Sequence, residues 1–370
     1  MHDVQALESP TTSVAIPYQL HRTGIVMRPL EGDPVEQGGV LNPGGARARN
    51  GDYLLFPRLV ALGNFSRIGI ARVKYDSLGM PHAVERLGIA LEPTEQYELN
   101  ERSGGGCEDA RVTYIPSLDT YVMTYVAYGP LGPRAALAVS HDLFSWTRVG
   151  KIVFAPYHGA DMNGYGNKDA LLFPEPIVGP DGRLSLALLH RPMYEYWTDD
   201  DQGTHTFATP PPGITSNCWT IWISYCPIDD ANWLGAASGA AHSPALFSDH
   251  HLLMLPDRPW ESIRLGGGTP PIRLPEGWFT IYHGIGRSTR AGAHAGLRYS
   301  AGALVLDVAD PRRIAYRSSL PILEPLLPEE TSGVVADVVF PTAIDRRSDH
   351  LDVYYGMADA CIGVAQMKTV

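Results

Sequence analysis

The sequence predicts an all-β protein, a β-propeller with five blades. Long amphipathic helical patterns are missing from the printed sequence, and its Gly 38 and Pro 31 supply many turns. Short alternating or apolar runs of about five to eight residues recur between Gly, Pro, Asp and Asn, which is the pattern of strands joined by turns. One pattern of two successive strands occurs five times along the chain. A repeated β unit of this kind is typical of a propeller.

Each blade is predicted from this two-strand pattern. Its first strand is rich in Tyr, Leu and Val and ends in polar residues, and its second strand carries small and β-branched residues that let one blade pack closely on the next. The repeat of roughly 65 to 90 residues suits four-stranded blades with long loops. In chain order the copies are 53–58 with 66–71, 121–125 with 135–140, 184–191 with 220–225, 278–283 with 300–305, and 351–355 with 361–365.

Polar residues at matching repeat positions predict a single pocket. Corresponding positions of a propeller converge on one mouth, so residues far apart in sequence come together. We expect the polar residue that ends each first strand to point at the axis: Arg58, Tyr125, Arg191, His283 and Tyr355. Further polar clusters occupy apparent turns before the inner strands: 42–45, 108–111, 167–169, 264–271 and 337–341.

The predicted domain organisation is an N-terminal arm, residues 1–35, followed by a single propeller domain, residues 36–370. One blade cannot bury both of its faces alone, so the five copies form one unit. Residues 195–217 and 234–248 interrupt the repeats as insertions, and the first is expected to be a surface loop that overhangs the site. Both are expected to shape one side of the predicted pocket.

Composition excludes several classes of partner. The formal net charge of -11 argues against nucleic acid or an anionic membrane, although a local basic pocket could still bind a phosphorylated ligand. The first residues do not show the basic start and following apolar run of a signal peptide, so none is expected. No apolar stretch approaches the length of a membrane span, so none is expected either. The four cysteines are scattered without metal-ligand spacing, so free thiols, a cytoplasmic location and no metal site are expected.

The predicted pocket contains an unusual balance of charges. An ordinary inverting glycosidase uses two carboxylates about 6.5 to 9.5 Å apart. Many cations beside a sugar site make more sense if an anion also binds, and phosphate is the obvious small anion. Phosphate attacking the anomeric carbon needs no general base, so one carboxylic acid would suffice. The basic residues are Arg58, Lys168, Arg191, Arg264 and His283, and the carboxylates are Glu108, Asp109, Asp169 and Asp359.

Each of these residues also has an ordinary structural explanation. The Glu108–Asp109 pair could belong to a charged turn, Arg191 could pair with a blade carboxylate, and His283 could be a hydrogen-bonded core histidine. Lys168 and Asp169 could form an internal salt bridge. Their occurrence at matching repeat positions is the stronger signal, and it favours one shared site.

The motifs in this order resemble glycoside hydrolase family 130, the mannoside phosphorylases and related mannosidases. The resemblance extends from about Asn42 to Ala365. Its main pieces are Asn42-Pro43, Glu108-Asp109-Ala110-Arg111, Asn167-Lys168-Asp169, His190-Arg191-Pro192, Gly266-Gly267-Gly268-Thr269, Tyr282-His283-Gly284, Val339-Phe340-Pro341 and Ala358-Asp359. The resemblance implies a five-bladed propeller that carries out inverting phosphorolysis of β-mannosides, releasing α-mannose 1-phosphate. Inorganic phosphate would be a co-substrate, with no cofactor, and a homo-oligomer is expected.

The resemblance also implies roles for individual residues. Asp109 matches the general acid, which is thought to act through the 3-hydroxyl of the mannosyl unit. Lys168, Arg191, Arg264 and His283 fall at or near the phosphate-binding positions. The remaining candidates are substrate-binding, with the mannosyl ring assigned to the first three: Asn42, Arg58, Asp359, Glu108, Asp169 and Phe340.

Two departures from the family pattern leave alternatives open. Ala110 stands where Pro is usual, and Lys168-Asp169 stands where many phosphorylases have Arg-Asn, so Lys offers a point charge without the bidentate fork of Arg. A β-mannoside hydrolase of the same family would need a second carboxylate to activate water, and Asp169 and Glu195 are the candidates. A five-bladed arabinanase or xylosidase, with three carboxylates, and a non-catalytic sugar-binding propeller are the alternatives from other classes.

Overall fold

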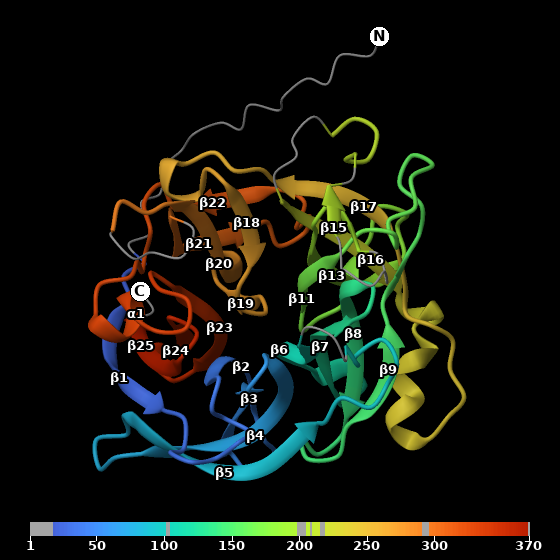
Figure 1. Ribbon diagram of the computed structural model, residues 1–370. Coiled ribbons are helices and arrows are strands. Elements are labelled where there is room, and N and C mark those ends of the chain that lie inside the picture. Colours follow the sequence, from blue (N-terminus) through green and yellow to red (C-terminus); the bar gives the residue numbers. More distant parts are fainter. Residues whose placement is uncertain are drawn as a thin grey trace.

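The computed structural model describes residues 18–100, 104–197, 205–207, 209–214, 219–290 and 296–368. Regular structure in these ranges is almost wholly strand, and the strands form five antiparallel units around a central axis (Figure 1). The predicted all-β class and five-bladed propeller are therefore confirmed. No helix in the described part of the chain is long and apolar enough to cross a bilayer.

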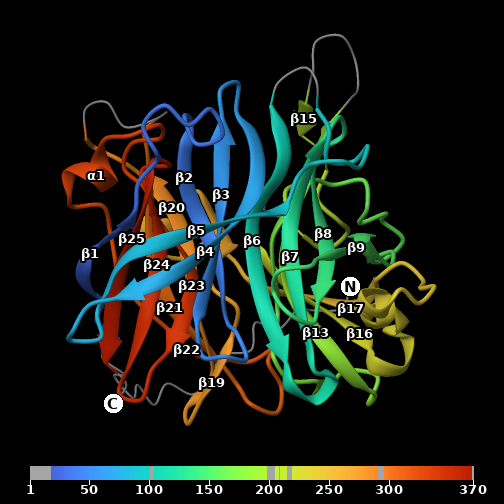
Figure 2. The same cartoon turned by 90° about the horizontal axis from the view of Figure 1, so that it is seen from below.

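Each blade begins with a strand near the axis and ends with a strand at the rim (Figures 1 and 2). The first blade is β2 (Gly39–Arg47), β3 (Tyr53–Ala61), β4 (Phe65–Tyr75) and β5 (Pro81–Leu91). The second is β6 (Gly105–Ile115), β7 (Thr120–Gly129), β8 (Gly132–Ser140) and β9 (Thr147–Lys151), and a short parallel bridge joins β4 to β6. The third is β11 (Asn167–Leu172), β13 (Leu184–Pro192), β16 (Ile221–Pro227) and β17 (Leu246–Met254), extended by β10 (Val153–Phe154) and β12 (Ile177–Val178).

The fourth and fifth blades depart from a simple meander. In the fourth, β18 (Arg264–Gly267) and β19 (Ile272–Leu274) share the inner position beside β20 (Gly277–Arg287), followed by β21 (Leu297–Leu306) and β22 (Ile314–Arg317). In the fifth, β23 (Val339–Arg346), β24 (His350–Met357) and β25 (Cys361–Lys368) are completed by β1 (His21–Met27) from the start of the chain. The remaining described elements are the hairpin β14 (Glu195–Trp197) and β15 (His205–Phe207), the helix α1 (Pro328–Thr331), and the 3-10 turns η1 (Pro116–Leu118), η2 (Ile228–Asp230), η3 (Asn232–Ser238) and η4 (Pro259–Glu261).

The core is divided among the contacts between neighbouring blades. Strands near the axis are buried on both faces, as in β6, whereas the rim strand β5 is largely exposed or half-buried, because blades cover only the inner strands from both sides. Five clusters of buried apolar residues each unite two neighbouring blades. Members from the two blades are Phe56 and Met123, Leu137 and Trp222, Ile223 and Leu304, Ile281 and Val353, and Leu55 and Tyr354. The last pair joins the fifth blade to the first and closes the ring.

Part of the expected N-terminal arm belongs to the propeller. Arg22 pairs in register with Ala365 and Ile25 with Gly363, so β1 is the rim strand of the fifth blade. Polar residues in this segment had suggested an arm, but a rim strand needs an apolar side on only one face, and Val26 and Met27 supply it. Residues 1–17 lie outside the described residues.

The two expected insertions differ in position. Of residues 195–217, the described parts include the β14–β15 hairpin, and Tyr165 Oη donates a hydrogen bond to the carbonyl of Thr209. Residues 234–248 do not shape the pocket: η3 packs on β8 and β9, and Leu246 already belongs to β17. Ser238 Oγ lies 3.4 Å from His141 Nε2. His141 follows the last residue of β8, whereas the part of β8 nearest to Glu108 is at Ala135, which pairs with Val126, the partner of Glu108. That prediction was wrong because Trp233 and Ala236 anchor this segment in the core between the second and third blades.

Candidate active site

A cavity of about 320 Å³ lies at the axis of the propeller, on the side where the inner strands begin. All of the predicted site residues line it except Glu108, which lines an adjoining cavity. The lining also contains residues that the sequence had not singled out. The predicted members are Asn42, Arg58, Asp109, Lys168, Asp169, Arg191, Arg264, His283, Phe340 and Asp359, and the others are Met193, Trp219, Tyr299, Val335 and Val338.

Bulges in three inner strands turn side chains into this cavity. Leu41 pairs with Arg58, Glu108 with Val126, and Lys168 with Arg191, and after each pair the register slips by one residue. The residue that follows each pair has a left-handed backbone: φ is 43° at Asn42, 49° at Asp109 and 53° at Asp169. Asn and Asp tolerate this region better than other residues with a Cβ, and strained positions of this kind cluster at functional sites. The polar clusters read as turns are therefore bulged inner strands.

The second strand of each blade also contributes to the cavity. The prediction that five polar residues at the ends of these strands point at the axis was right for three of them. Arg58, Arg191 and His283 line the cavity as expected. Tyr125 and Tyr355 do not: their hydroxyls donate to Glu98 and Glu330 within their own blades. Pairing shows that the positions equivalent to Arg58 in the second and fifth blades are Val126 and Gly356, one residue further on. A shift of one residue moves a strand side chain to the other face, so the expected alignment pointed these two tyrosines the wrong way.

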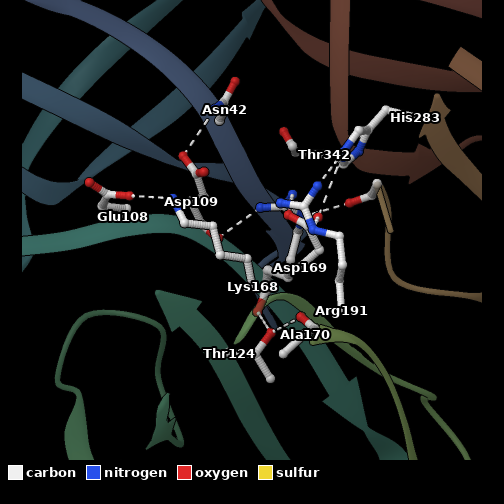
Figure 3. A network of polar contacts seen from close by, with 12 residues as sticks. Asn42, Glu108, Asp109, Thr124, Lys168, Asp169, Ala170, Arg191, His283 and Thr342 are labelled. Atoms are coloured by element: carbon white, nitrogen blue, oxygen red, sulfur yellow. Dashed lines mark hydrogen bonds and ion pairs between the residues drawn. The ribbon is translucent and has the colours of Figure 1, made fainter. Parts of the chain in front are cut away.

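Asp109 lies on one side of the cavity among hydrogen-bond donors. Asn42 Nδ2 donates to Asp109 Oδ1 at 3.0 Å (Figure 3). Arg58 Nη1 lies 3.5 Å from the same oxygen. Burial alone raises the pKa of Asp109, but the nearby charges of Arg58, Lys168 and Arg111 outweigh burial and hold this pKa below its ordinary value. The carboxylate is therefore ionised in the empty site near neutral pH.

Glu108 joins two of the cations and separates the two cavities. Arg58 Nη2 donates to Glu108 Oε1 at 2.9 Å, and Lys168 Nζ donates to Glu108 Oε2 at 3.3 Å. Burial lowers the pKa of Lys168, but the charges of Glu108 and Asp109 more than compensate and raise it. Lys168 is thus held beside Asp109 by a carboxylate from the neighbouring blade, and it remains fully charged.

The opposite side of the cavity collects cations around Asp169. Arg191 Nε lies 3.0 Å from Asp169 Oδ2, and His283 Nε2 lies 3.7 Å from the same oxygen (Figure 3). Burial raises the pKa of Asp169 more than Arg191 and Arg111 lower it. Burial, reinforced by the positive charges of Arg191 and Arg111, lowers the pKa of His283 well below its ordinary value, so the imidazole is neutral.

Arg264 is the least compensated cation of the site. Its guanidinium stacks over the ring of Trp219, 4.1 Å from the centroid, and Nη2 donates to Tyr299 Oη at 3.2 Å. Among the described residues, no carboxylate forms an ion pair with it. The Trp219 ring also lies beneath Arg191, at 5.0 Å. Cation–π contacts fix the guanidinium groups without neutralising them, which leaves their charge available to an anion.

Several buried polar atoms around the cavity lack a hydrogen-bond partner of good geometry within the described residues. Buried groups of this kind are rare in native proteins and point to a missing ligand. They belong to residues of the first, third and fourth blades that line the cavity: Asn42 Oδ1, Asp169 Oδ2, Arg191 Nε, Arg264 Nε and His283 Nδ1.

Asp359 and Phe340 complete the wall toward the fifth blade. Asp359 follows β24 with a φ of 52°, and burial, opposed by Arg58 and reinforced by Asp109, raises its pKa to about 6. The ring of Phe340 packs on His283 with 4.4 Å between centroids. Gly266 makes room for the cluster opposite, since a Cβ there would collide with the Asp169 carboxylate and the His283 ring.

A second cavity of about 480 Å³ opens beside Asp109. It shares Arg58, Lys168 and Asp359 with the axial cavity, and Glu108 forms part of its wall. The loop between β3 and β4, with Asn64, and the start of β6 form its outer side. The sequence did not predict this cavity as a separate site, because it is built from residues of four blades that no single motif contains.

The structure does not describe every residue that the sequence analysis named. Glu195 begins β14, and its side chain lies outside the description. Cys107, Cys226 and Cys361 are buried free thiols, and Cys218 lies outside the described residues. The assigned roles of the residues that do meet at the axis remain predictions.

Comparison with known proteins identifies relatives of the whole propeller. The family described as beta-1,4-mannooligosaccharide phosphorylase (Glyco_hydro_130) matches residues 20–370. A 1,2-beta-oligomannan phosphorylase of Thermoanaerobacter sp. (strain X514) is 31% identical over 93% of this chain and 96% of its own length. A beta-1,2-mannobiose phosphorylase of Listeria innocua is 34% identical over 74% of this chain, and that match spans only 60% of the Listeria protein.

A solved structure of the same kind agrees with the fold. The beta-1,2-mannobiose phosphorylase of Listeria innocua, determined in complex with beta-1,2-mannobiose, superposes with a TM-score of 0.67 at 27% identity. The superposition covers 94% of this chain and 96% of that one. The agreement therefore includes all five blades and the axis where the cavity lies.

Proposed function

This chain belongs to glycoside hydrolase family 130, and from that premise we propose that it is an inverting β-mannoside phosphorylase. Phosphate and a β-mannosyl sugar are converted to α-mannose 1-phosphate and the free sugar. The relatives named above act on β-1,2-linked substrates and the family description names a β-1,4 linkage, so either linkage is a candidate here.

One observation carries this proposal: Asp109 shares a cavity with a group of cations that the carboxylates around it neutralise only in part. Arg264 has no carboxylate partner among the described residues, and Arg191 shares Asp169 with Arg111 and the neutral His283. A neutral sugar alone gives no reason to bury so much positive charge. An anion of the size and charge of phosphate supplies the missing partner.

The arrangement suits displacement at the anomeric carbon. Phosphate, held by Arg191, Arg264 and His283, attacks from the face opposite the departing oxygen, so the new bond to phosphate forms as the glycosidic bond breaks and β becomes α. Asp109 supplies the proton that the departing oxygen needs, directly or through the mannosyl 3-hydroxyl. The hydrogen phosphate dianion loses its proton once it is esterified, and this proton restores Asp109, so the reaction has no net proton change.

The free protein holds Asp109 ionised, whereas a general acid must carry a proton. The negative charge of phosphate bound in the same cavity opposes the positive field that lowers the Asp109 pKa, so the acid gains its proton in the loaded site. The second cavity lies on the Asp109 side, where the departing sugar must leave. We assign this cavity to that sugar, bounded by Glu108 and Asn64.

The test is product analysis with β-1,2- and β-1,4-mannobiose, with and without inorganic phosphate. We expect mannose 1-phosphate only when phosphate is present, and a loss of about 10²- to 10⁴-fold in kcat for Asp109→Asn. Asp119→Asn is a matched control, because Asp119 has a φ of 47° in the same blade and its side chain is 61% exposed. Free mannose formed without phosphate would instead make the protein a hydrolase, and saturable sugar binding without turnover would make it a binding module.

A further inference from the structure

Arg111 is a buried cation next to the site to which the sequence assigned no role. It is 1% exposed and lies in β6, two residues after Asp109. Its guanidinium spans the axis below the cavity: Nε donates to the Gly268 carbonyl of the fourth blade at 2.6 Å, and Nη2 lies 3.9 Å from Asp169 Oδ1 of the third. The Phe340 ring of the fifth blade lies 5.6 Å from its Cζ.

The remaining donor of Arg111 reaches the strained backbone beside the acid. Nη1 donates to the carbonyl of Asp109 at 2.7 Å and lies 3.3 Å from the carbonyl of Ala110. These carbonyls sit in the bulge, where the pairing with β7 slips between Glu108 and Arg111. A left-handed backbone is unfavourable for a residue with a Cβ, so it persists only where its surroundings hold it. The arginine fork supplies that restraint.

Arg111 also links the two halves of the reaction site. Its neighbours are the backbone of the proposed acid on one side and the carboxylate that pairs with Arg191 on the other. An Arg donates from a rigid planar fork, and a Lys in its place could satisfy one carbonyl but not two from different blades. Arg111 therefore ties the Asp109 backbone to the fourth blade through the Gly268 carbonyl, and it places a positive charge 3.9 Å from Asp169 Oδ1.

We infer that Arg111 is a positioning residue, which holds the Asp109 bulge in its left-handed conformation and fixes the acid relative to the phosphate side of the cavity. This inference rests on the proposed phosphorylase function. Arg111 does not touch substrate, since it is not among the residues that line the cavity.

The charge of Arg111 gives the inference a second readout. It is one of several charges that face Asp109 from the surrounding elements: the cations Arg58, Lys168, Arg111 and Arg191, and the carboxylates Glu108, Asp169 and Asp359. Arg111→Lys keeps the charge and loses the fork, whereas Arg111→Gln loses both. The two variants therefore separate geometry from electrostatics.

The experiment measures kcat, KM for phosphate and the pH profile of both variants. We expect kcat to fall by about 10- to 100-fold in each, because a misplaced acid costs this much, while KM for phosphate stays within about threefold of wild type. The pH above which kcat declines should rise in Arg111→Gln only, since removal of a cation raises the Asp109 pKa. Carboxyl ¹³C NMR, with the Asp109 signal assigned from Asp109→Asn, reads the same pKa without turnover.

Arg148→Lys is the control for loss of a buried arginine fork, because Arg148 pairs with Glu98 at the rim of the second blade and is distant from the cavity. It should lower the melting temperature and leave kcat unchanged. The inference is overturned if folded Arg111 variants keep kcat within threefold of wild type, or if neither variant folds, which would make Arg111 a residue of the fold alone. Failure of wild type to form mannose 1-phosphate is a separate result and refutes the proposed function instead.

Discussion

At the scale of single residues, the site depends on carboxylates that share one small volume with cations. The charge of Asp109 raises the pKa of Asp359, yet the pKa shifts of the two carboxyls run in opposite directions. Asp109 lies closer to donors, with Asn42 and Arg58 on its Oδ1, and its charged form is stabilised. Asp359 has burial as its largest influence, so its charged form is disfavoured.

The raised pKa of Asp359 predicts a pH-dependent stability cost. Its pKa is about 6 in the folded protein, against an ordinary value of 3.8 for an aspartate. The folded state therefore keeps the proton longer than the unfolded state, and ionisation costs stability as pH rises from about 4 to 6, by at most about 3 kcal/mol. Asp359→Asn, which cannot ionise, should gain melting temperature over wild type across this window and hold a constant advantage above it.

Thermal unfolding between pH 4 and 8 checks this prediction. A difference between variant and wild type that is the same at pH 4 and pH 7 would contradict it. Asp352→Asn is no suitable control, because Asp352 also has a raised pKa, whereas Asp119→Asn removes a carboxylate whose pKa is lowered by hydrogen bonds from Tyr114 and Arg49. That control should show the opposite trend with pH.

At the scale of elements, three blades share a buried cluster of Glu, Tyr and Arg. In each, a Glu that precedes the inner strand accepts a hydrogen bond from a Tyr of the second strand and pairs with an Arg of the rim strand. The clusters are Glu98 with Tyr125 and Arg148, Glu261 with Tyr282 and Arg317, and Glu330 with Tyr355 and Arg22. Each ties inner, middle and outer parts of one blade together.

The other two blades replace this cluster. In the first, Glu36 keeps its Arg86 partner but Pro57 occupies the position of the Tyr. In the third, His190 takes the Tyr position and hydrogen-bonds through Ser224 to His250. Pro57 and His190 directly precede Arg58 and Arg191. The residue that follows the cluster position lines the axial cavity in the first, third and fourth blades, as Arg58, Arg191 and His283, because neighbouring strand residues face opposite sides.

Loss of the tyrosine hydroxyl from one of these clusters should lower the free energy of unfolding and leave catalysis unchanged. Tyr355→Phe leaves the fully buried Glu330 without a donor at 3.0 Å, and we expect a loss of about 1–3 kcal/mol in the free energy of unfolding. Tyr114→Phe is the matched control, since its hydroxyl bonds to Asp119 on the exposed surface, and its cost should be near zero. Denaturant unfolding measures both, and an equal cost in the two variants would refute the role of the cluster.

At the scale of the whole molecule, the ring is closed by the start of the chain. β1 completes the fifth blade, its Arg22 pairs with Glu330, and Val26 and Met27 join the cluster that holds the fifth blade to the first. A chain shortened to begin at Arg28 would leave β25 as an unpaired edge and Glu330 without its cation.

We expect that truncation to cost on the order of 5 kcal/mol or more, from lost apolar burial and a broken buried ion pair. A chain that begins at Tyr18 keeps every described strand and is the matched control. Melting temperature and soluble yield distinguish them, and activity should fall with the fifth blade, since Asp359 lies between β24 and β25. Equal melting temperatures for the two chains would show that β1 is dispensable for closure.

The sequence by itself determined the class of fold, the number of blades and most of the cavity. The two-residue periodicity of strands and the spacing of turns depend only on local chemistry, so both can be recognised in the sequence. Repetition then placed Asn42, Asp109 and Asp169 at equivalent positions of the inner strands and Arg58 and Arg191 at equivalent positions of the second strands, and the structure brings these side chains together.

Only the tertiary structure decided which face each side chain takes and what surrounds it. The bulges at Asn42, Asp109 and Asp169 looked like turns, and the one-residue offset of Tyr125 and Tyr355 was invisible, because both depend on pairing with another strand. Trp219, Tyr299 and the contacts of Arg111 join blades far apart in sequence, and no local pattern records them. Strand propensity and repetition are properties of neighbouring residues, whereas register and the meeting of blades are set by contacts that exist only once the ring has closed.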